Sequence, residues 1–477
     1  MATEAQASGA SVPKNGAVVS ASNTDSPKFI EGQPQYLYQH RYVPGIETID
    51  VYLQHDGYKA LRKALTMDQE AIINEIKLSG LRGRGGAGFP TFIKWNGIPK
   101  NWDAPHYLVV NADEGEPGTA KDRDLMNGIP HLLVEGCIIA CWAIRAKSCY
   151  IYVRGEYRQP IKAVQTAIDE AYSKGFLGKN ILGSGFDCDI YVHSGAGSYE
   201  CGEESALMSS LMGERGMPRH KPPAAPLPVI SGVWNSPTIV NNVETIATAV
   251  PIINMGGAEY SKVGTGTPGQ GPASRGTKLI TLSGHVNRPG NYEIVLGTTI
   301  RDIVEKLGGG IWKGRKLKFM IPGGSSTPLL PPEFYDTPYD YEALGKTGSL
   351  LGSGALIIYD ETANVVEVMT RLMEFYAHES CGKCTPCREG TNWLTKIHQR
   401  ILAGGGRYED IDILLDICNN LFGRSFCALG DAAAMPIGGF FAGKGAIYYF
   451  RHEYEEMIRQ GKNGKGASFK PLQMASI

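Results

Sequence analysis

Hydrophobic and polar residues follow two different periods along the first half of the chain. Apolar positions recur at helical spacing in residues 68–79, 131–146, 160–174 and 202–212, and short apolar runs typical of buried strands lie at 107–110, 149–153 and 188–192. Thr66 to Gln69 has the form of a capping box that would begin the first of these helices. Strands that alternate with helices predict a parallel sheet, because parallel neighbours need long crossover connections. We therefore expect an α/β domain over residues 36–270, with ligands at the carboxyl ends of its strands.

The pattern changes beyond a Gly- and Pro-rich stretch at residues 264–276, which marks an expected domain boundary. Strands at 278–283 and 292–295 surround a turn, a helix capped by Thr298 or Thr299 covers 300–307, and further strands lie at 317–321 and 355–359. This order predicts a small β-grasp (ubiquitin-like) domain over 271–360. Helical periods at 365–376, 391–402, 411–421 and 448–458 then predict a helical bundle over 361–465.

The composition is that of a folded and nearly neutral chain. Its 477 residues carry 47 Lys and Arg against 48 Asp and Glu, which argues against nucleic acid or an anionic membrane surface as the main partner. No run of 18 or more uncharged apolar residues occurs, so we expect no transmembrane helix. Residues 1–35 resemble neither a secretory signal nor an Arg-rich mitochondrial presequence. We expect a disordered tail there and a bacterial cytoplasmic location.

The first candidate for ligand chemistry is the segment Gly83-Arg84-Gly85-Gly86-Ala87-Gly88-Phe89-Pro90. Its four glycines let backbone N–H groups approach a phosphate or a ring closely. The segment lacks the Gly-Lys-Ser/Thr of a P-loop, and it follows a predicted helix, whereas a Rossmann fingerprint follows a strand. A surface turn is the alternative, but the nearby Arg82 and Lys94 favour a phosphate or nucleotide cradle.

Two acidic loops form the second candidate. Residues 111–118 (Asn-Ala-Asp-Glu-Gly-Glu-Pro-Gly) follow one predicted strand, and residues 195–204, which include Glu200, Glu203 and Glu204, follow another. Carboxylates at such positions accept hydrogen bonds from ribose hydroxyls or from the polar edge of a flavin. Each acid taken alone could equally be an ordinary partner of a helix N-terminus. Two such loops at neighbouring strand ends favour a binding site.

The third candidate is a cysteine pattern. Cys381, Cys384 and Cys387 are each separated by two residues, and Cys427 follows at a distance. Three closely spaced thiolates with a remote fourth are typical of a [4Fe–4S] cluster, whereas zinc sites more often contain two separate Cys-x2-Cys pairs. Lys383, Arg388 and Arg424 are expected to offset the thiolate charge, and Cys418 is expected to be a core residue. A cluster beside a flavin would let electrons that arrive in pairs leave singly.

In this order, the motifs resemble those of the NADH-binding flavoprotein (FMN and [4Fe–4S]) subunit of bacterial respiratory complex I (NADH:quinone oxidoreductase). The resemblance runs from about Tyr38 to Tyr454 and also includes Asn241-Asn242-Val243-Glu244-Thr245 and Ile321-Pro322-Gly323-Gly324. It implies a Rossmann-like FMN domain, a β-grasp domain and a C-terminal helical domain with four helices and the iron–sulfur cluster. It also implies NADH as substrate, and as partners the [2Fe–2S] subunit and the large Fe–S subunit of the peripheral arm. Membrane contact would come only through the membrane arm.

The resemblance also implies a role for each matching residue. The FMN would be lined by Gly83, Arg84, Gly85, Gly86 and Lys94, and its isoalloxazine edge or ribityl chain would bond to Asn111, Asp113 and Glu114. Its pocket would be closed by Tyr199, Gly202 and Glu203, and its phosphate end would be held by Asn241 and Asn242. Without the resemblance, the last two residues are interpreted as a plain loop. Phe89 would stack against NADH, Glu116 and Glu204 would meet its polar groups, and Lys221 is also expected to bind cofactor. The cluster ligands would be Cys381, Cys384, Cys387 and Cys427.

One departure from the family pattern concerns the segment that starts at Lys221. The family usually has an aromatic residue after Lys-Pro-Pro, which helps to sandwich the adenine, but Ala224 stands there in this chain. Altered or weaker NADH binding is therefore expected. No side chain is assigned as a catalytic acid or base, because hydride transfer to a bound flavin depends on positioning.

Two other functions remain open from the sequence. The first is the diaphorase subunit of a soluble NAD-linked formate dehydrogenase or hydrogenase, many of which carry additional cluster-binding regions. No cysteine precedes Cys137 and none follows Cys427, which favours complex I. The second is a non-enzymatic scaffold with a structural zinc ion.

Overall fold

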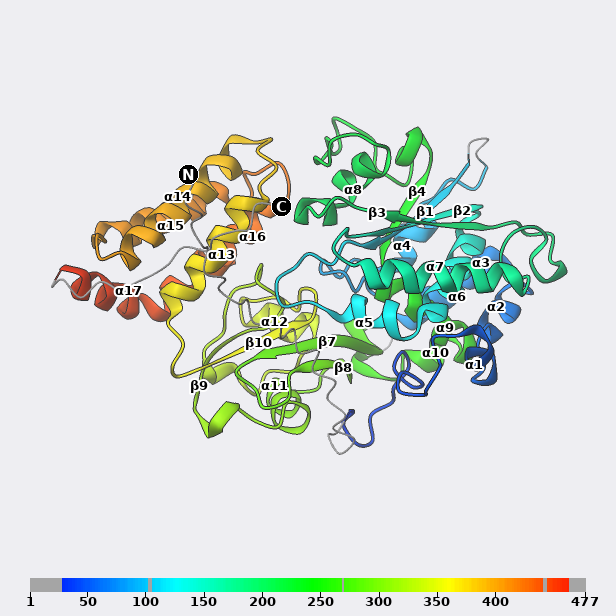
Figure 1. The fold of residues 1–477 in the computed structure, drawn as a ribbon, viewed down its shortest axis with the longest axis horizontal. Helices are drawn as coiled ribbons and strands as arrows, with labels where there is room; N and C mark the ends of the chain where they lie inside the picture. Colours follow the sequence, from blue (N-terminus) through cyan, green and yellow to red (C-terminus); the bar gives the residue numbers. More distant parts are fainter. Residues whose placement is uncertain (1–27, 102–104, 268–269, 441–443, 463–477) are drawn as a thin grey trace, which may run out of the picture.

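The computed structural model describes residues 28–101, 105–267, 270–440 and 444–462. Most of the expected tail, residues 1–27, lies outside this set, as do the last residues of the expected helical region. The rest forms three parts, which Figure 1 shows with the α/β part at one end, the C-terminal helices at the other and a second sheet between them along one side.

A four-stranded parallel sheet in the order β3-β2-β1-β4 is the centre of the α/β domain. Its strands are β1 (Tyr107–Ala112), β2 (Ser148–Val153), β3 (Asp189–Ser194) and β4 (Thr238–Asn242). The order reverses direction between β1 and β4, so the carboxyl ends of these two strands form the topological switch point at which α/β sheets bind ligands. The parallel α/β prediction is confirmed.

The two faces of this sheet are covered unequally. Leu108, Val110 and Ile151 belong to the main core, which also contains residues from helices of the same domain. Val109 and Tyr152 point to the opposite face and pack with Leu207 of α8 in a smaller cluster. The helices of this domain are α1 (Ile49–Gln54), α2 (Lys59–Ala64), α3 (Gln69–Ser79), α4 (Thr91–Asn96), α5 (Lys121–Gly128), α6 (Pro130–Ile144), α7 (Arg158–Ser173), α8 (Glu204–Leu211), α9 (Val243–Met255) and α10 (Gly257–Tyr260).

Two local predictions in this domain are wrong. Helix α3 begins at Gln69 with Asp68 at the N-cap position, and the Thr66 hydroxyl instead donates to the Lys63 carbonyl across 2.8 Å. Thr66 therefore closes the turn after α2 and caps no helix. The interpretation of Asn241 and Asn242 as a plain loop is also wrong: both end strand β4, and the Asn242 side chain caps α9 by accepting from the Glu244 N–H.

The second sheet has the mixed order β8-β7-β10-β9 and confirms the β-grasp prediction. Strands β7 (Thr277–Gly284) and β10 (Ala355–Asp360) are parallel at its centre, and β8 (Gly290–Val295) and β9 (Leu317–Ile321) are antiparallel neighbours. Helix α11 (Ile300–Asp302) is capped by the Thr299 side chain, and α12 is Tyr341–Lys346. The Gly- and Pro-rich stretch contains the hairpin β5 (Gly264–Thr267) and β6 (Gln270–Arg275), of which residues 268 and 269 lie outside the described set.

The C-terminal part is helical, as predicted, but contains one more helix than the periodicity indicated. Its helices are α13 (Val365–Glu379), α14 (Thr385–Leu402), α15 (Glu409–Leu421), α16 (Ala428–Gly438) and α17 (Ala446–Lys462). Helix α16 was missed because, apart from Asp431, its residues are apolar on all sides, and most of them are buried. Cys418 is buried in the core of this bundle, as expected.

Within the described residues, no single helix is long and apolar enough to cross a membrane. The sharply bent pair α5 and α6 reaches the required length and composition only when its two helices are counted together, and α6 is almost completely buried.

Candidate functional site

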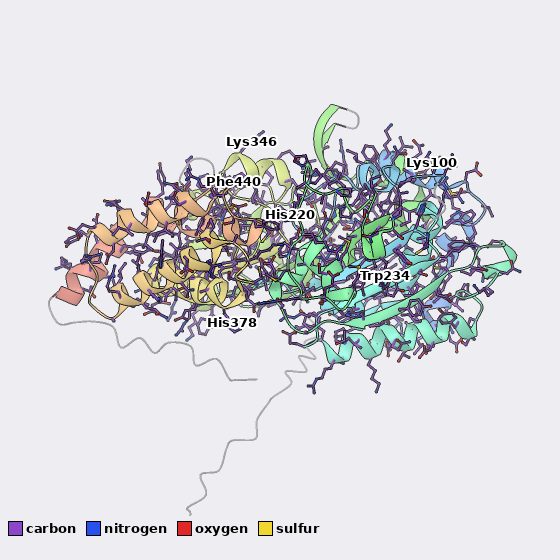
Figure 2. The ribbon with its side chains drawn as sticks, turned by 90° about the horizontal axis from the view of Figure 1, so that it is seen from above. Lys100, His220, Trp234, Lys346, His378 and Phe440 are labelled. Carbon is purple, nitrogen blue, oxygen red and sulfur yellow. The ribbon has the colours of Figure 1, made fainter. Side chains whose placement is uncertain are left out.

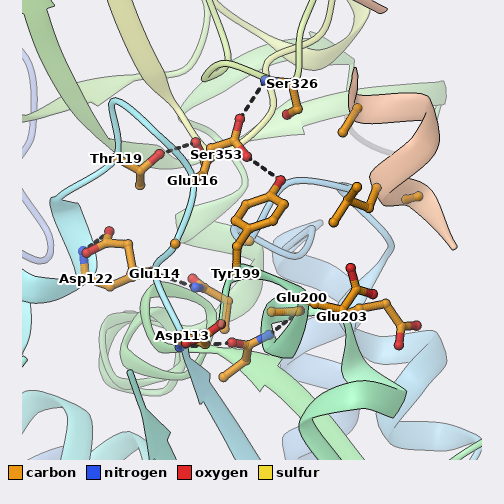
Figure 3. Close-up of a pocket in the computed structure, with 18 of the residues that line it drawn as sticks. Asp113, Glu114, Glu116, Thr119, Asp122, Tyr199, Glu200, Glu203, Ser326 and Ser353 are labelled. Carbon is orange, nitrogen blue, oxygen red and sulfur yellow. Dashed lines mark hydrogen bonds between the residues drawn. The ribbon is translucent and has the colours of Figure 1, made fainter. Parts of the chain in front are cut away.

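A large pocket lies where β1 and β4 end, and we call it the strand-end pocket (Figure 3). It encloses about 1010 Å³, including space open to solvent. Nine of the residues expected to bind cofactor line it: Gly85, Asn111, Asp113, Glu114, Glu116, Tyr199, Gly202, Glu203 and Asn242. The β-grasp domain contributes Ser326 and Ser353, and α16 contributes Ala428, Leu429, Ala432 and Met435. All three parts of the chain therefore meet at this pocket.

Two buried carboxyl groups follow β1 directly. Asp113 is 8% exposed, and its Oδ2 atom is buried without a hydrogen-bond partner in the part of the chain that the structure describes. Burial raises the pKa of Asp113 to about 8. Glu114 accepts from the backbone N–H groups of Asp122 and Arg123 at 2.7 and 2.9 Å, and burial raises its pKa to about 7. Asp113 is therefore a polar group without a protein partner at the pocket wall.

Glu116 joins the acidic loop to the other parts of the molecule. Its carboxylate accepts from the Tyr199 hydroxyl and from the Ser326 N–H, each across 2.7 Å (Figure 3). Tyr199 packs edge-on against Phe375 of α13. Glu116 thus holds the α/β domain, the β-grasp domain and the helical bundle together at one point of the pocket.

The second acidic loop also lines the pocket. Glu203 caps helix α8, because its carboxylate accepts from the Ser205 and Ala206 N–H groups. The same carboxylate lies 3.3 Å from the Lys221 ammonium. The Asn111 side chain donates to the Gly202 carbonyl across 2.9 Å, which ties the two acidic loops to each other.

The glycine-rich segment forms a closed turn at the pocket. The Gly83 N–H donates to the Phe89 carbonyl across 2.8 Å, and the Tyr341 hydroxyl of the β-grasp domain donates to the Gly83 carbonyl across 3.0 Å. A Cβ atom at Gly88 would come within 2.7 Å of Tyr341, so only glycine fits there. Gly85 lines the pocket, whereas Gly83, Gly86 and Phe89 do not, and the Phe89 side chain is 52% exposed.

Other expected site residues are not part of the described pocket lining. Arg84 is fully buried, and its guanidinium donates to the Arg275 carbonyl across 2.7 Å. Lys94 forms an ion pair with Glu204 at 2.9 Å. The Asn241 side chain accepts from the Trp95 indole across 2.8 Å. Arg84, Lys94, Glu204, Lys221 and Asn241 are absent from the described lining of the pocket.

Sequence reasoning missed three kinds of lining residue. Lys121 and Asp122 at the start of α5 lack any motif of their own. Ser326 and Ser353 follow β9 and precede β10, and the four α16 residues are ordinary apolar ones. The two serines and the α16 residues reach the pocket only through the packing of one domain on another. Glu200 belongs to the second acidic loop, but no role of its own was predicted for it.

A second, smaller pocket of about 230 Å³ is lined by Cys381, Cys384, Cys387 and Cys427, and we call it the cysteine pocket. The first two cysteines precede α14, the third lies in its first turn, and Cys427 is the N-cap residue of α16. The four thiols surround the space without converging on one point: no group of three His, Cys, Asp or Glu side chains suited to a single metal ion occurs among the described residues.

The walls of the cysteine pocket connect it to the rest of the site. The Cys427 thiol donates to Glu200 across 3.2 Å, and the Phe426 N–H donates to the Cys384 sulfur across 3.4 Å. His220, which Figure 2 places between the helical bundle and the α/β domain, packs edge-on against Phe426. Burial raises the pKa of Cys387 to about 11, so cluster binding has to displace its proton.

Of the three cations expected to offset the thiolate charge, Lys383 lines this pocket, although its ammonium donates to the Pro218 carbonyl. The Arg388 guanidinium bonds to Gly382 and Glu389, and that of Arg424 bonds to Asn420. In the described structure, these three side chains therefore donate their hydrogen bonds to oxygen atoms and not to the cysteine sulfurs.

Comparison with known proteins assigns the three parts of the chain. Residues 76–251 match the Nuo51 FMN-binding domain, 279–330 match the SLBB domain, and 367–457 match the NADH-ubiquinone oxidoreductase-F iron-sulfur binding region. Among solved structures, the NAD+-reducing [NiFe]-hydrogenase in its H2-reduced state is similar, with a TM-score of 0.73 and 35% identity over 83% of this chain and 63% of that one. For the same hydrogenase in its air-oxidized state, the TM-score is 0.75 and the identity is 33%, over 89% of this chain and 67% of that one.

Curated relatives are more similar still. The F subunit of the NADH-quinone oxidoreductase of Streptomyces coelicolor is 52% identical over 426 residues, which cover 89% of this chain and 90% of the relative. That of Mycobacterium tuberculosis is 52% identical over 89% of this chain and 92% of its own, and that of Rickettsia felis is 48% identical over 85% and 92%. Because this identity extends over nearly the full length of both chains, the protein belongs to the family of F subunits of NADH-quinone oxidoreductase.

Proposed function

We propose that this chain is the NADH-oxidising subunit of complex I, with FMN held in the strand-end pocket and a [4Fe–4S] cluster held in the cysteine pocket. The observation that carries the proposal is that the two pockets share one wall residue, Glu200. When bound, FMN accepts electrons in pairs from a nicotinamide and gives them up singly, and the cluster accepts one at a time.

The residues of the strand-end pocket fit a flavin. The unpartnered Oδ2 of Asp113 offers an acceptor or, when protonated, a donor to a polar ring edge or a ribityl hydroxyl. Gly85 leaves backbone exposed in the wall, and a Cβ there would come within 3.1 Å of Asn242. We propose that this wall is supported by Gly83, Arg84, Gly86, Lys94 and Asn241. The flavin would be surrounded by Asn111, Glu114, Tyr199, Gly202 and Glu203.

NADH is proposed to bind at the open side of the same pocket. The Phe89 side chain is 52% exposed and free to stack on a ring, and the Phe89 carbonyl closes the glycine-rich turn by accepting from the Gly83 N–H. Glu116, Glu204 and Lys221 would supply polar contacts to the dinucleotide. The chain's own contribution is therefore to orient two rings and to exclude water from between them.

The cysteine pocket fits a cluster because of its donor set. Four thiols from two separate helix starts surround one cavity, which is the ligand set of a [4Fe–4S] cluster. Cys381, Cys384, Cys387 and Cys427 are the proposed ligands. A single zinc ion would require four sulfurs close to one point.

Family membership implies other subunits of complex I as partners. We propose that these include the [2Fe–2S] subunit and the large Fe–S subunit of the peripheral arm, and that the chain lies on the cytoplasmic side of a bacterial inner membrane. We also propose domain boundaries near residues 35, 270 and 360. The hairpin β5–β6 and the start of α13 lie close to the last two.

The experiment is anaerobic purification of the full chain followed by flavin, iron and acid-labile sulfide analysis. The expected result is one FMN and four irons per chain, with NADH-dependent ferricyanide reduction that disappears when FMN is removed. A colourless chain with one zinc ion would refute the proposal. The hydrogenase alternative rests on 33–35% identity, against 52% for the complex I relative, and supplying the purified partner subunits of each system would distinguish the two.

A further inference from the structure

A buried chain of charges connects the strand-end pocket to the β-grasp domain. The Lys278 ammonium of β7 lies 2.6 Å from Oε2 of Glu244 in α9, and the Lys121 ammonium of α5 lies 2.9 Å from the same oxygen. The three side chains are at most 1% exposed. The sequence motifs predicted no role for any of them.

Each charged group in this buried network also forms other hydrogen bonds or ion pairs. Lys278 also donates to the Leu279 and Ser353 carbonyls at 2.7 and 3.1 Å, and the other Glu244 oxygen accepts from the Leu279 N–H at 2.8 Å. Lys121 further contacts Asp122 at 2.7 Å. Such a fully satisfied buried network holds its members in one arrangement. The Lys121 ammonium is thereby fixed from two domains.

The position of Lys121 gives this arrangement a consequence for the cofactor. Among the residues that the structure describes, it is the only lysine or arginine lining the strand-end pocket. The same pocket is lined by six acids: Asp113, Glu114, Glu116, Asp122, Glu200 and Glu203. FMN carries an anionic phosphate and gains electrons on reduction, so it needs positive charge in this acidic surrounding.

We propose that Lys278 of the β-grasp domain is a positioning residue for the flavin. Lys278 acts through Glu244, because it shares the Glu244 carboxylate with Lys121. The positive charge of Lys121 is then only partly neutralised and remains effective in the pocket. The inference rests on the proposed function. It gives the β-grasp domain a part in tuning the cofactor, in addition to its contribution of wall residues.

The charges around Lys278 set the conditions for a test. Burial lowers the pKa of Lys278 to about 7, Glu244 opposes this effect, and Lys121 of α5 and Arg84 of the glycine-rich segment add to it. Measurements at pH 6 therefore keep Lys278 charged. A nearby positive charge raises the midpoint potential of a bound flavin, and a nearby negative charge lowers it.

The experiment measures the flavin midpoint potential at pH 6 in the FMN-loaded full chain. Lys278→Met is expected to lower the potential, because Glu244 then neutralises Lys121 more completely. Glu244→Gln is expected to raise it, because Lys121 then keeps only one of its two carboxylate partners, Asp122. The double variant is expected to return close to the wild-type value. Lys306→Met is the control, since that exposed lysine pairs with Asp302 on the surface of the same domain.

A merely structural role predicts shifts of the same sign in both single variants, and that result would overturn the inference. If Lys278→Met does not fold, Glu244→Gln decides alone, and an unchanged or lowered potential refutes the inference. Failure of the wild-type chain to bind FMN or to be reduced by NADH would instead refute the proposed function.

Discussion

The Cys427 thiol donates a hydrogen bond to the Glu200 carboxylate across 3.2 Å, and this contact joins the two pockets of the molecule. Glu200 is 3% exposed and lines both pockets. Cys427 is the N-cap residue of α16, and the next two residues of that helix line the strand-end pocket. One side chain and one helix turn therefore separate the proposed flavin from the proposed cluster, which keeps the path for electrons short.

Loss of one cluster ligand is expected to remove the cluster and spare the flavin. Cys427→Ala should reduce iron and acid-labile sulfide to a small fraction of the wild-type content, since three thiolates do not complete the ligand set. FMN content should remain, because Cys427 does not line the strand-end pocket. Cys418→Ala is the matched control: its side chain is buried in the same bundle but lies outside the cysteine pocket. Equal iron loss in both variants would contradict the ligand assignment.

The glycine-rich turn offers a pair of variants that differ by position alone. A Cβ at Gly85 would stand 3.1 Å from the Asn242 Cβ atom, whereas one at Gly83 would meet its nearest atom at an ordinary 3.5 Å. Gly85→Ala should therefore weaken FMN binding by about tenfold, which corresponds to about 1.4 kcal/mol. Gly83→Ala should leave it nearly unchanged. Quenching of flavin fluorescence measures both, and an equal effect would show that the Asn242 contact is not the cause.

The carboxyl of Asp113 predicts a pH dependence of stability in the FMN-free chain. Burial raises the pKa of this group from 3.8 to about 8, so the folded state holds the proton more tightly than the unfolded state does. Its contribution to stability is complete below pH 3.8 and is lost as the pH rises to about 8. Asp113→Asn should therefore reduce the fall in Tm between pH 5 and pH 8.

Asp169→Asn serves as the control for this experiment, because that aspartate lies exposed on α7. Thermal denaturation of wild type and both variants at the two pH values makes the comparison. A Tm that falls equally in all three chains would show that Asp113 does not carry the dependence.

The alanine that follows Lys-Pro-Pro predicts a change in NADH affinity. Ala224 is exposed in a turn in which its N–H donates to the Lys221 carbonyl across 3.0 Å, and Lys221 reaches Glu203 of the strand-end pocket. An aromatic ring at this position would offer a stacking surface for adenine. Ala224→Phe is expected to lower the KM for NADH several-fold with little change in kcat. Ala225→Phe tests whether position matters, and a KM that is unchanged or raised by Ala224→Phe refutes the prediction.

Local sequence patterns predicted those elements that have a strong period or a strong cap. The core strands of both sheets and the long amphipathic helices lie close to the expected ranges, and Thr299 caps α11 as one of the two expected residues. Strand β4 and helix α16 were among the elements that were missed. The first is short and the second is buried on most sides, so neither shows a clear alternation of polar and apolar positions.

The order of amino acids alone specifies the chemical groups: a glycine-rich turn, two acidic loops and four cysteines with cluster spacing. Which of these groups face one cavity follows from the fold, because it depends on contacts between residues far apart in the chain. The fold placed Lys121, Ser353 and α16 at the pocket and turned the Arg84 side chain away to the Arg275 carbonyl. Spacing records neighbours along the chain, whereas a binding site is defined by neighbours in space, and the packing of three domains alone supplies those.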